Sequence, residues 1–341
     1  MRLRSHMQLR VVVLALLLLT SAGVIVAFRS QAEALRAGAP FALDHVFIVI
    51  EENHEYDQII GNPAAPHINT LAQQYGLATS YFAVTSPSEG NYVAMLGGES
   101  YGIEDDEPYT AHTIDQLNIV DQLERAGLRW GGFFQSMPVP AFTQPCAPTP
   151  CGGDAGSLYA SRHNGFLNFS DINNNPERLQ HLVPITDLDL DLAAGSIPNF
   201  SVIVPDNCHN MHGDPPHCPD RGKPGSDADN QLIAEGDAYL GDLIGRVTKA
   251  TFWNQGNNAI IVVWDEGTTS ASCCATPRGG GHLPAIVATS HGPRGLKDPT
   301  HYNHYSLLRT VQLAFGLPCL EMSCDFEHVK PMLPLFSAST G

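Results

Sequence analysis

Basic residues are scarce in this chain of 341 residues. It has 18 lysines and arginines against 35 aspartates and glutamates, which gives a formal net charge of −17 at pH 7. Proteins that bind nucleic acid non-specifically need a basic surface, so we expect no nucleic-acid partner. An anionic substrate would need positive charge supplied locally by a metal ion, an arginine or a histidine.

The sequence also lacks internal repeats, heptads and any Cys-x2-Cys pair. The last absence argues against a zinc site, although two cysteine pairs have the looser x4 spacing. Hydrophobic residues make up 43% of the chain and charged residues 16%, which indicates a globular protein. The length is sufficient for a full hydrophobic core.

The N-terminal segment has the composition of an export signal. Three arginines precede an apolar run over residues 11–28, and an A-x-A-like cleavage site follows it. The run is long for a signal peptide and just long enough to span a bilayer. We therefore predict that residues 1–35 are a signal peptide or an N-terminal membrane anchor. Residues 36–341 should form a single domain outside the cytoplasm, either secreted or attached to the membrane through residues 11–28.

Eight cysteines fit an oxidising compartment. Three pairs are close enough in sequence to close small loops, and we predict that they form disulfides: Cys146 with Cys151, Cys208 with Cys218, and Cys319 with Cys324. Cys273 and Cys274 are adjacent. They either bridge each other or pair with partners elsewhere.

Two short apolar runs end in groups of oxygen-bearing side chains. The run His45–Ile50 precedes Glu51-Glu52-Asn53-His54, and the run Ile260–Trp264 precedes Asp265-Glu266-Gly267. Short runs rich in β-branched residues are typical of strands buried on both faces. One such ending is well explained as a solvated loop. Two of them point to a divalent metal ion held between strand ends.

The rest of the chain alternates between strand and helix patterns. We expect helices from Pro66 to the stop at Gly76, from Ser88, and over residues 115–126, 232–247 and 304–315, and strands near residues 83–85, 128–134, 200–204 and 283–289. This alternation predicts an α/β fold, with a mostly parallel central sheet and helices on both faces. Residues 137–175, 213–226 and 268–281 should be irregular excursions at the strand-end side, where such sheets bind ligands.

Ser88 is predicted to begin a helix just after a proline turn. A hydroxyl at that position is most often an N-cap. The position also suits a nucleophile, because backbone N–H groups and the helix dipole favour a phosphoryl group there. These two roles stay open at this point.

Five motifs in order resemble those of the phosphoesterase family. They are IVIEEN at residues 48–53, TSPSEGNY at 85–92, HNMH at 209–212, WDE at 264–266 and HYSLLRT at 304–310. That family contains secreted bacterial acid phosphatases and phospholipases C, within the alkaline-phosphatase superfamily of folds. The resemblance spans about residues 44–318, and this short chain is more similar to the acid phosphatases.

The resemblance implies a role for each matching side chain. The predicted ligands of one divalent metal ion, whose identity stays open, are Glu52, Asn53, Asp265 and Glu266. The predicted catalytic residues are Ser88 as nucleophile, with His212 and His304 as candidates to protonate the leaving group. The predicted substrate-binding residues are Asn91, Arg162, His163 and His209.

The implied function is an extracytoplasmic, metal-dependent phosphomonoesterase that acts on phosphate esters through a phosphoserine. Two alternatives are phospholipase C action on lipid head groups and a non-catalytic surface protein of the same fold. Three departures from the family pattern bear on this choice: Ser86 replaces a usual His, Gly90 a usual Pro, and His209-Asn210 a usual Asn-Asp. They concern substrate and rate more than reaction class.

Overall fold

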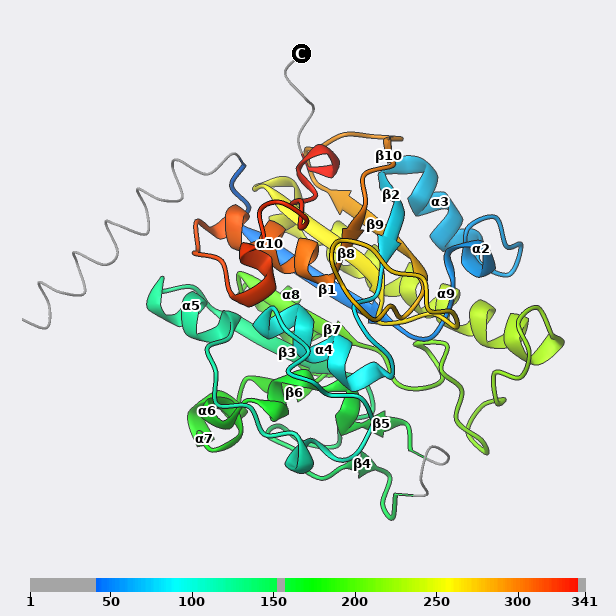
Figure 1. Cartoon of the computed structure of the whole chain (residues 1–341), viewed down its shortest axis with the longest axis horizontal. Coiled ribbons are helices and arrows are strands. Elements are labelled where there is room, and N and C mark those ends of the chain that lie inside the picture. The colour runs from blue at the N-terminus through cyan, green and yellow to red at the C-terminus, as the bar shows by residue number, and fades with distance from the viewer. Residues whose placement is uncertain (1–40, 152–156, 337–341) are drawn as a thin grey trace, which may run out of the picture.

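The computed structural model describes residues 41–151 and 157–336 (Figure 1). The predicted signal peptide or anchor, residues 1–35, lies outside these ranges. Within the described ranges, no helix combines the length and the apolar character needed to cross a membrane. A large apolar cluster between the sheet and its covering helices forms the core.

The described residues form a central sheet of nine strands in the spatial order β10-β2-β9-β8-β1-β7-β3-β6, with β11 paired to β2. The strands are β1 His45–Glu51, β2 Gly76–Phe82, β3 Trp130–Phe134, β6 Leu182–Pro184, β7 Phe200–Val204, β8 Asn258–Trp264, β9 His282–Thr289, β10 Lys297–Asp298 and β11 Tyr302–Asn303. Strand β9 is antiparallel to both β2 and β8, and the other pairs are parallel. The predicted mostly parallel sheet is confirmed, with β9 as the reversed strand.

Helices cover the sheet on both faces (Figure 1). They are α2 Tyr56–Ile59, α3 Pro66–Gln74, α4 Ser88–Gly97, α5 Ile119–Arg125, α6 Ser170–Asn173, α7 Pro176–Leu179, α8 Thr186–Ala194, α9 Asp227–Lys249 and α10 His304–Phe315. Helix α4 packs on α10, and α3 packs on α9. Successive residues of a strand point to opposite faces. Accordingly Glu51 faces Asp237 of α9, whereas Glu52 contacts Tyr92 of α4.

The register of β1 and β8 explains why their polar ends meet. All seven residues of β8 and all but the first of β1 are buried, as expected for central parallel strands covered on both faces. Glu51 pairs with Trp264, and the backbone N–H of Asp265 donates to the carbonyl of Glu51 at 2.9 Å. Two in-register parallel strands therefore deliver Glu52 and Asp265 side by side at the same edge of the sheet.

Two predicted elements differ from the structure. The strand expected near residues 83–85 lies earlier, at β2, because Gly76–Phe82 is buried between β9 and the short strands β10 and β11. Its weak sequence pattern is overridden by tertiary pairing. The helix expected from residue 115 begins only at Ile119, because Asn118 caps it. The Asn118 side chain accepts from the backbone N–H of Val120. The backbone N–H of Asn118 donates to the carboxylate of Asp121.

Four disulfides link the eight cysteines. The three predicted pairs are confirmed, and the adjacent pair bridges itself: Cys146–Cys151, Cys208–Cys218, Cys273–Cys274 and Cys319–Cys324. The bridge between Cys208 and Cys218 closes the excursion that leads out of β7. It therefore holds the HNMH segment near the carboxyl end of that strand.

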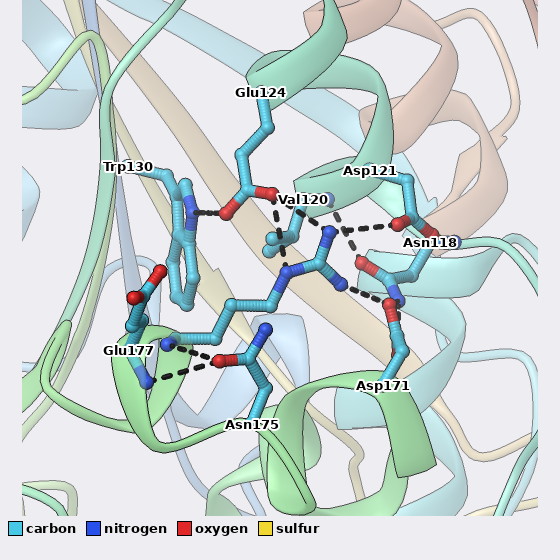
Figure 2. Close-up of polar contacts among 9 residues, drawn as sticks. Asn118, Val120, Asp121, Glu124, Trp130, Asp171, Asn175 and Glu177 are labelled. Carbon is cyan, nitrogen blue, oxygen red and sulfur yellow. Dashed lines mark hydrogen bonds and ion pairs between the residues drawn. The ribbon is translucent and has the colours of Figure 1, made fainter. Parts of the chain in front are cut away.

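A polar cluster anchors α6 and α7 to α5 at the edge of the sheet (Figure 2). Arg178 of α7 lies 2.9 Å from Asp121 and 2.7 Å from Glu124, and it also pairs with Asp171. The other oxygen of Glu124 accepts from the indole N–H of Trp130 at the start of β3, at 3.0 Å. This network ties the irregular excursion after β3 back to the sheet.

Candidate active site

Ser88 lies at the centre of the candidate site, as the first residue of α4. Its Oγ lies 3.2 Å from Glu52 Oε2 and 3.4 Å from Glu266 Oε1, and all three residues are buried. Asp265 is also close, since a hydrogen bond from Ser88 opposes the larger effect of burial on the pKa of that carboxyl. The ends of β1 and β8 and the start of α4 thus converge on one hydroxyl.

The carboxyl groups around Ser88 are short of positive charge. Burial, and then the neighbouring Asp265, raise the pKa of Glu52 well above its usual value. Burial also raises the pKa of Asp265 to about 7. Burial together with Asp265 raises the pKa of Glu266 to about 8. Carboxyl groups in this condition bind either protons or a cation.

Three of the four predicted metal ligands keep a buried oxygen with no hydrogen-bond partner among the described residues. These atoms are Asn53 Oδ1, Asp265 Oδ2 and Glu266 Oε2. Buried polar atoms in folded proteins are almost always hydrogen-bonded, so these oxygens indicate a further ligand. Carboxylate and amide oxygens are the donors that hard divalent cations prefer. The residues therefore fit the divalent ion that the motifs imply.

The second oxygen of Glu52 faces a different set of groups. The phenol of Tyr92 donates to Glu52 Oε1 at 2.5 Å, and His163 Nε2 lies 3.3 Å from the same oxygen. One ligand atom from each of Glu52, His163 and His212 lie within 4.8 Å of one another. This group could also hold a cation. It shares Glu52 with the four predicted metal ligands, Glu52, Asn53, Asp265 and Glu266.

Arg162 sets the charge on this histidine side. Its Nη2 lies 3.5 Å from His212 Nε2. Burial, and then the charge of Arg162, lower the pKa of His163 well below its usual value, so that ring is neutral. The His212 Nδ1–H donates to the carbonyl of Gly213 at 2.9 Å, which leaves Nε2 toward the site. The Arg162 guanidinium disfavours a cation beside His163 and His212 and favours an anion there. The group of Glu52, Asn53, Asp265 and Glu266 is therefore the better metal site.

The turn that carries Glu52 and Asn53 is held from behind. The Glu52 N–H donates to the carbonyl of Asn210 at 2.8 Å, and its carbonyl accepts from His54 Nδ1 at 2.8 Å. His54 Nε2 lies 3.0 Å from Asp229 at the start of α9, and both side chains are fully buried. Arg221 donates to the carbonyl of Asn53, a residue in the left-handed region with φ +53°. The 213–226 excursion and α9 thus position the predicted ligands.

Asn91 holds the turn that leads into Ser88. Its Oδ1 accepts from the N–H groups of Val84 and Thr85, and its Nδ2 donates to the carbonyl of Thr85. The predicted contact with a phosphate oxygen would have to come from the second N–H of this amide. Gly90, one of the departures, is explained by the same turn. A Cβ there would lie 2.7 Å from Thr85 Cγ2.

His304 does not have the contacts of a general acid. It is fully buried, its Nε2 lies 2.6 Å from the carbonyl of Asp265, and its Nδ1 lies 2.9 Å from the hydroxyl of Tyr81. Burial lowers its pKa to about 4. These contacts make His304 a support for the end of β8. His212 is left as the better candidate to protonate a leaving group.

His209 faces away from Ser88. Its Nδ1 lies 2.8 Å from Asp206 and its ring lies against Tyr239 of α9, the helix that also faces Glu51. The hydrogen bond to Asp206 raises the pKa of His209. These contacts involve Asp206 and Tyr239, and the assignment of His209 to the substrate side stays a prediction.

Two supports were missed in the sequence. Tyr92 follows Ser88 by four residues in a helix, so its place on the same face could have been anticipated. The pairing of His54 with Asp229 joins residues 175 apart and has no signal in the sequence. Ser86 lies beside Glu266, since a hydrogen bond from Ser86 lowers the pKa of Glu266 against the larger effects of burial and Asp265.

The matches to known proteins define the class of this chain, which is a phosphoric ester hydrolase. The chain belongs to the phosphoesterase family, whose family model matches residues 62–318. It is 30% identical over 286 residues to a phosphatidylinositol-3-phosphatase of Mycobacterium tuberculosis, covering 83% of this chain and 81% of that protein.

Fungal acid phosphatases are also similar. The chain is 27% identical to a probable acid phosphatase of Kluyveromyces lactis and 24% identical to an acid phosphatase of Aspergillus fumigatus, covering 82% of this chain in each case. It spans 60% and 56% of the length of these two proteins. The crystal structure of a Vibrio parahaemolyticus protein in the alkaline phosphatase superfamily shares the fold, with a TM-score of 0.57 and 14% identity. The match covers 86% of this chain and 70% of that one.

Proposed function

We propose that this protein is an extracytoplasmic, metal-dependent phosphomonoesterase that acts through Ser88. The observation that carries the proposal is the position of the Ser88 hydroxyl, between Glu52 and Glu266 at the start of α4. A serine is activated when a base or a cation lies next to it, and both are available here. The four disulfides are consistent with an oxidising compartment.

Glu52, Asn53, Asp265 and Glu266 would hold one divalent ion. When bound, that ion would favour loss of the serine proton and neutralise charge on the phosphoryl oxygens. Its identity is left open by oxygen ligands alone, which suit several hard cations.

The residues of the chain then divide the remaining work. Ser88 Oγ attacks phosphorus and passes its proton to an adjacent carboxylate, either Glu52 Oε2 or Glu266 Oε1. Arg162 and the backbone N–H groups at the start of α4 bind the equatorial oxygens. For His212 to protonate the departing alcohol, its ring must enter the reaction with a proton on Nε2 as well as on Nδ1. Water then attacks the phosphoserine and passes a proton to His212, while the carboxylate returns its proton to Ser88 Oγ. This releases inorganic phosphate and restores the serine hydroxyl.

Two substrate classes compete under this proposal. Soluble phosphomonoesters are favoured by the similarity to fungal acid phosphatases. A phosphorylated lipid is favoured by the similarity to the mycobacterial phosphatidylinositol-3-phosphatase. Phospholipase C action and a non-catalytic role are the remaining alternatives.

A release assay separates these alternatives. The full chain would be given p-nitrophenyl phosphate, phosphatidylinositol 3-phosphate and phosphatidylcholine, each with and without a chelator. We expect phosphate release from one of the monoesters, abolished by the chelator and restored by a divalent ion. Release of phosphocholine from phosphatidylcholine would support phospholipase C, and no release from any ester would contradict the proposal.

Two adjacent glutamates supply a matched pair of variants. Glu52→Gln should abolish metal binding and turnover, whereas Glu51→Gln should keep both. Glu51 is equally buried, but it faces α9, and burial followed by the charge of Asp237 raises its pKa well above the usual value. It is therefore largely neutral, and an amide replaces it at low cost. Metal content measured on both folded variants decides the assignment, and equal content in the two would contradict it.

A further inference from the structure

The residue after the nucleophile donates a hydrogen bond to a carboxylate from a distant loop. The backbone N–H of Glu89 donates to Asp106 Oδ1 at 3.1 Å. Glu89 is the second residue of α4, and the residue before the helix, Pro87, offers no side-chain cap. Asp106 therefore occupies a donor at the helix start, where an anion is most favoured.

Asp106 also lies beside the arginine of the site. Its Oδ2 is 4.0 Å from Arg162 Nε, and its side chain is 29% exposed, so it lies at the solvent side of the site. Its charge reaches the carboxyl groups around Ser88, because it adds to the larger effect of burial in raising the pKa of Asp265 and of Glu266. Asp106 thus contacts one donor and faces another that a phosphoryl group would use.

The segment Glu104–Glu107, which we term the acidic loop, holds Asp106 in this place. Glu104 pairs with Arg278 at 2.5 Å, and Asp105 lies 3.2 Å from His112 Nε2. The other nitrogen of His112 lies 2.7 Å from Glu89 itself. The contacts of the neighbouring residues therefore fix the acidic loop to the start of α4 and to the 268–281 excursion.

We infer that Asp106 weakens phosphate binding at the phosphoryl site, because its carboxylate competes with phosphate for the Glu89 N–H and Arg162. This inference rests on the proposed function. A phosphoryl group must displace Asp106 to use these donors. The same competition then helps to expel the inorganic phosphate left after hydrolysis, so Asp106 limits product inhibition.

Direct binding of inorganic phosphate tests this inference without requiring turnover. The metal-loaded full chain would be titrated calorimetrically with phosphate, comparing wild type with Asp106→Asn and Asp105→Asn. Asparagine keeps an oxygen that accepts from the Glu89 N–H, so the start of α4 stays capped and only the charge is lost. Asp105 is the matched control, since it lies on the same loop, is 58% exposed, and pairs with His112 instead.

We expect Asp106→Asn to bind phosphate about tenfold more tightly and Asp105→Asn to change affinity by less than about twofold, the tenfold corresponding to ~1.4 kcal/mol. Phosphate bound equally or more weakly by folded Asp106→Asn would overturn the inference. If Asp106→Asn fails to fold, Asp106→Ser, which also accepts from the N–H, replaces it.

The proposed function and the role of Asp106 can fail separately. If Asp106→Asn binds phosphate more tightly but the wild-type protein hydrolyses no ester, the proposed function is overturned and the anion site is kept. Normal hydrolysis with unchanged phosphate affinity in the variant would overturn the role of Asp106 alone.

Discussion

Glu52 has a different task at each of its two oxygens. Oε2 accepts from Ser88, while Oε1 accepts from Tyr92 and lies against His163. The ring of Tyr92 also stacks on His163, with centroids 5.4 Å apart and an interplanar angle of 17°. Tyr92 therefore holds the carboxylate from the side away from Ser88. This leaves Oε2 oriented toward Ser88 and the predicted metal.

Replacing Tyr92 by phenylalanine should weaken metal binding without removing any ligand. The ring and its stacking remain, but the hydrogen bond to a charged group is lost, which is worth about 1.5–3 kcal/mol. We expect roughly tenfold lower metal affinity or more, measured by titration of chelator-treated protein.

Tyr302→Phe is the matched control for this change. Tyr302 is also buried and also donates to a carboxylate, that of Asp298, at 2.6 Å, but it lies on β11 away from Ser88. It should lose stability and keep metal affinity. Equal metal affinity in the two variants would show that Tyr92 only stabilises the fold.

Among single residues, those at strand ends and in ordered motifs could be predicted from the sequence. Glu52, Asp265, Glu266 and Ser88 meet as predicted because strand register places them together. The positions of the histidine side chains were harder to predict, since the direction of each side chain depends on the path of the loop that carries it. Met211 has a φ of +77°, and around it His209 and His212 separate to different sides. No periodicity in a loop reports such a change of direction.

At the scale of elements, the start of α9 controls the turn after β1. His54 lies between two acceptors, with Nδ1 2.8 Å from the carbonyl of Glu52 and Nε2 3.0 Å from the carboxylate of Asp229. Asp229 also accepts from the backbone N–H of Gly225 in the preceding loop at 2.7 Å. The pair joins a helix to a metal-ligand turn across the 213–226 excursion.

Removing His54 should therefore affect both stability and the metal site. His54→Ala leaves the buried Asp229 carboxylate without this hydrogen-bond partner, and leaving a buried polar group unpaired costs about 1–3 kcal/mol. We expect a lower melting temperature and weaker metal binding, measured by calorimetry and metal titration. Disrupting an exposed pair such as Arg246 with Asp242, by Arg246→Gln, should leave metal binding unchanged. Unaltered metal affinity in folded His54→Ala would contradict the positioning role.

The elements themselves were predictable where their patterns are strong. β1, β7, β8 and α10 follow from apolar runs and clear stops, and α10 has the predicted bounds. β2 was misplaced because its sequence, GLATSYF, is small and polar in the middle and gains its stability from pairing with β9. The reversed direction of β9 was not predictable either, since it depends on how the 268–281 loop returns to the sheet.

At the scale of the whole molecule, an acidic protein concentrates several carboxyl groups around one serine. The formal net charge is −17, and the pKa values of Glu52, Asp265 and Glu266 are all raised by burial. In the unfolded chain such groups titrate near about 4. The folded, metal-free protein therefore holds more protons than the unfolded chain between about pH 4 and the folded values near 7 and 8.

The sign of the pH dependence follows from this difference. Because the folded pKa values are raised, the contribution of these groups to stability is fully present below about pH 4 and is lost as the pH rises through about 7 to 8. In chelator-treated protein we expect the wild type to lose more stability between pH 5 and pH 8 than Asp265→Asn does. A divalent ion should raise the melting temperature of the wild type more at pH 8 than at pH 5. A larger gain at pH 5 would contradict the metal-site assignment.

Ser88 is expected to carry the phosphoryl group during turnover, and this phosphoserine can be trapped. Protein incubated with a phosphomonoester would be quenched in acid and the phosphate mapped by mass spectrometry, in wild type, Ser88→Ala and Ser86→Ala. We predict phosphate on Ser88, a kcat lowered by several powers of ten in Ser88→Ala, equivalent to ~4 kcal/mol or more, and substantial activity in Ser86→Ala. An N-cap role alone would cost only about 1 kcal/mol of stability and leave turnover nearly intact. Phosphate found on Ser86, or full activity in Ser88→Ala, would contradict the account.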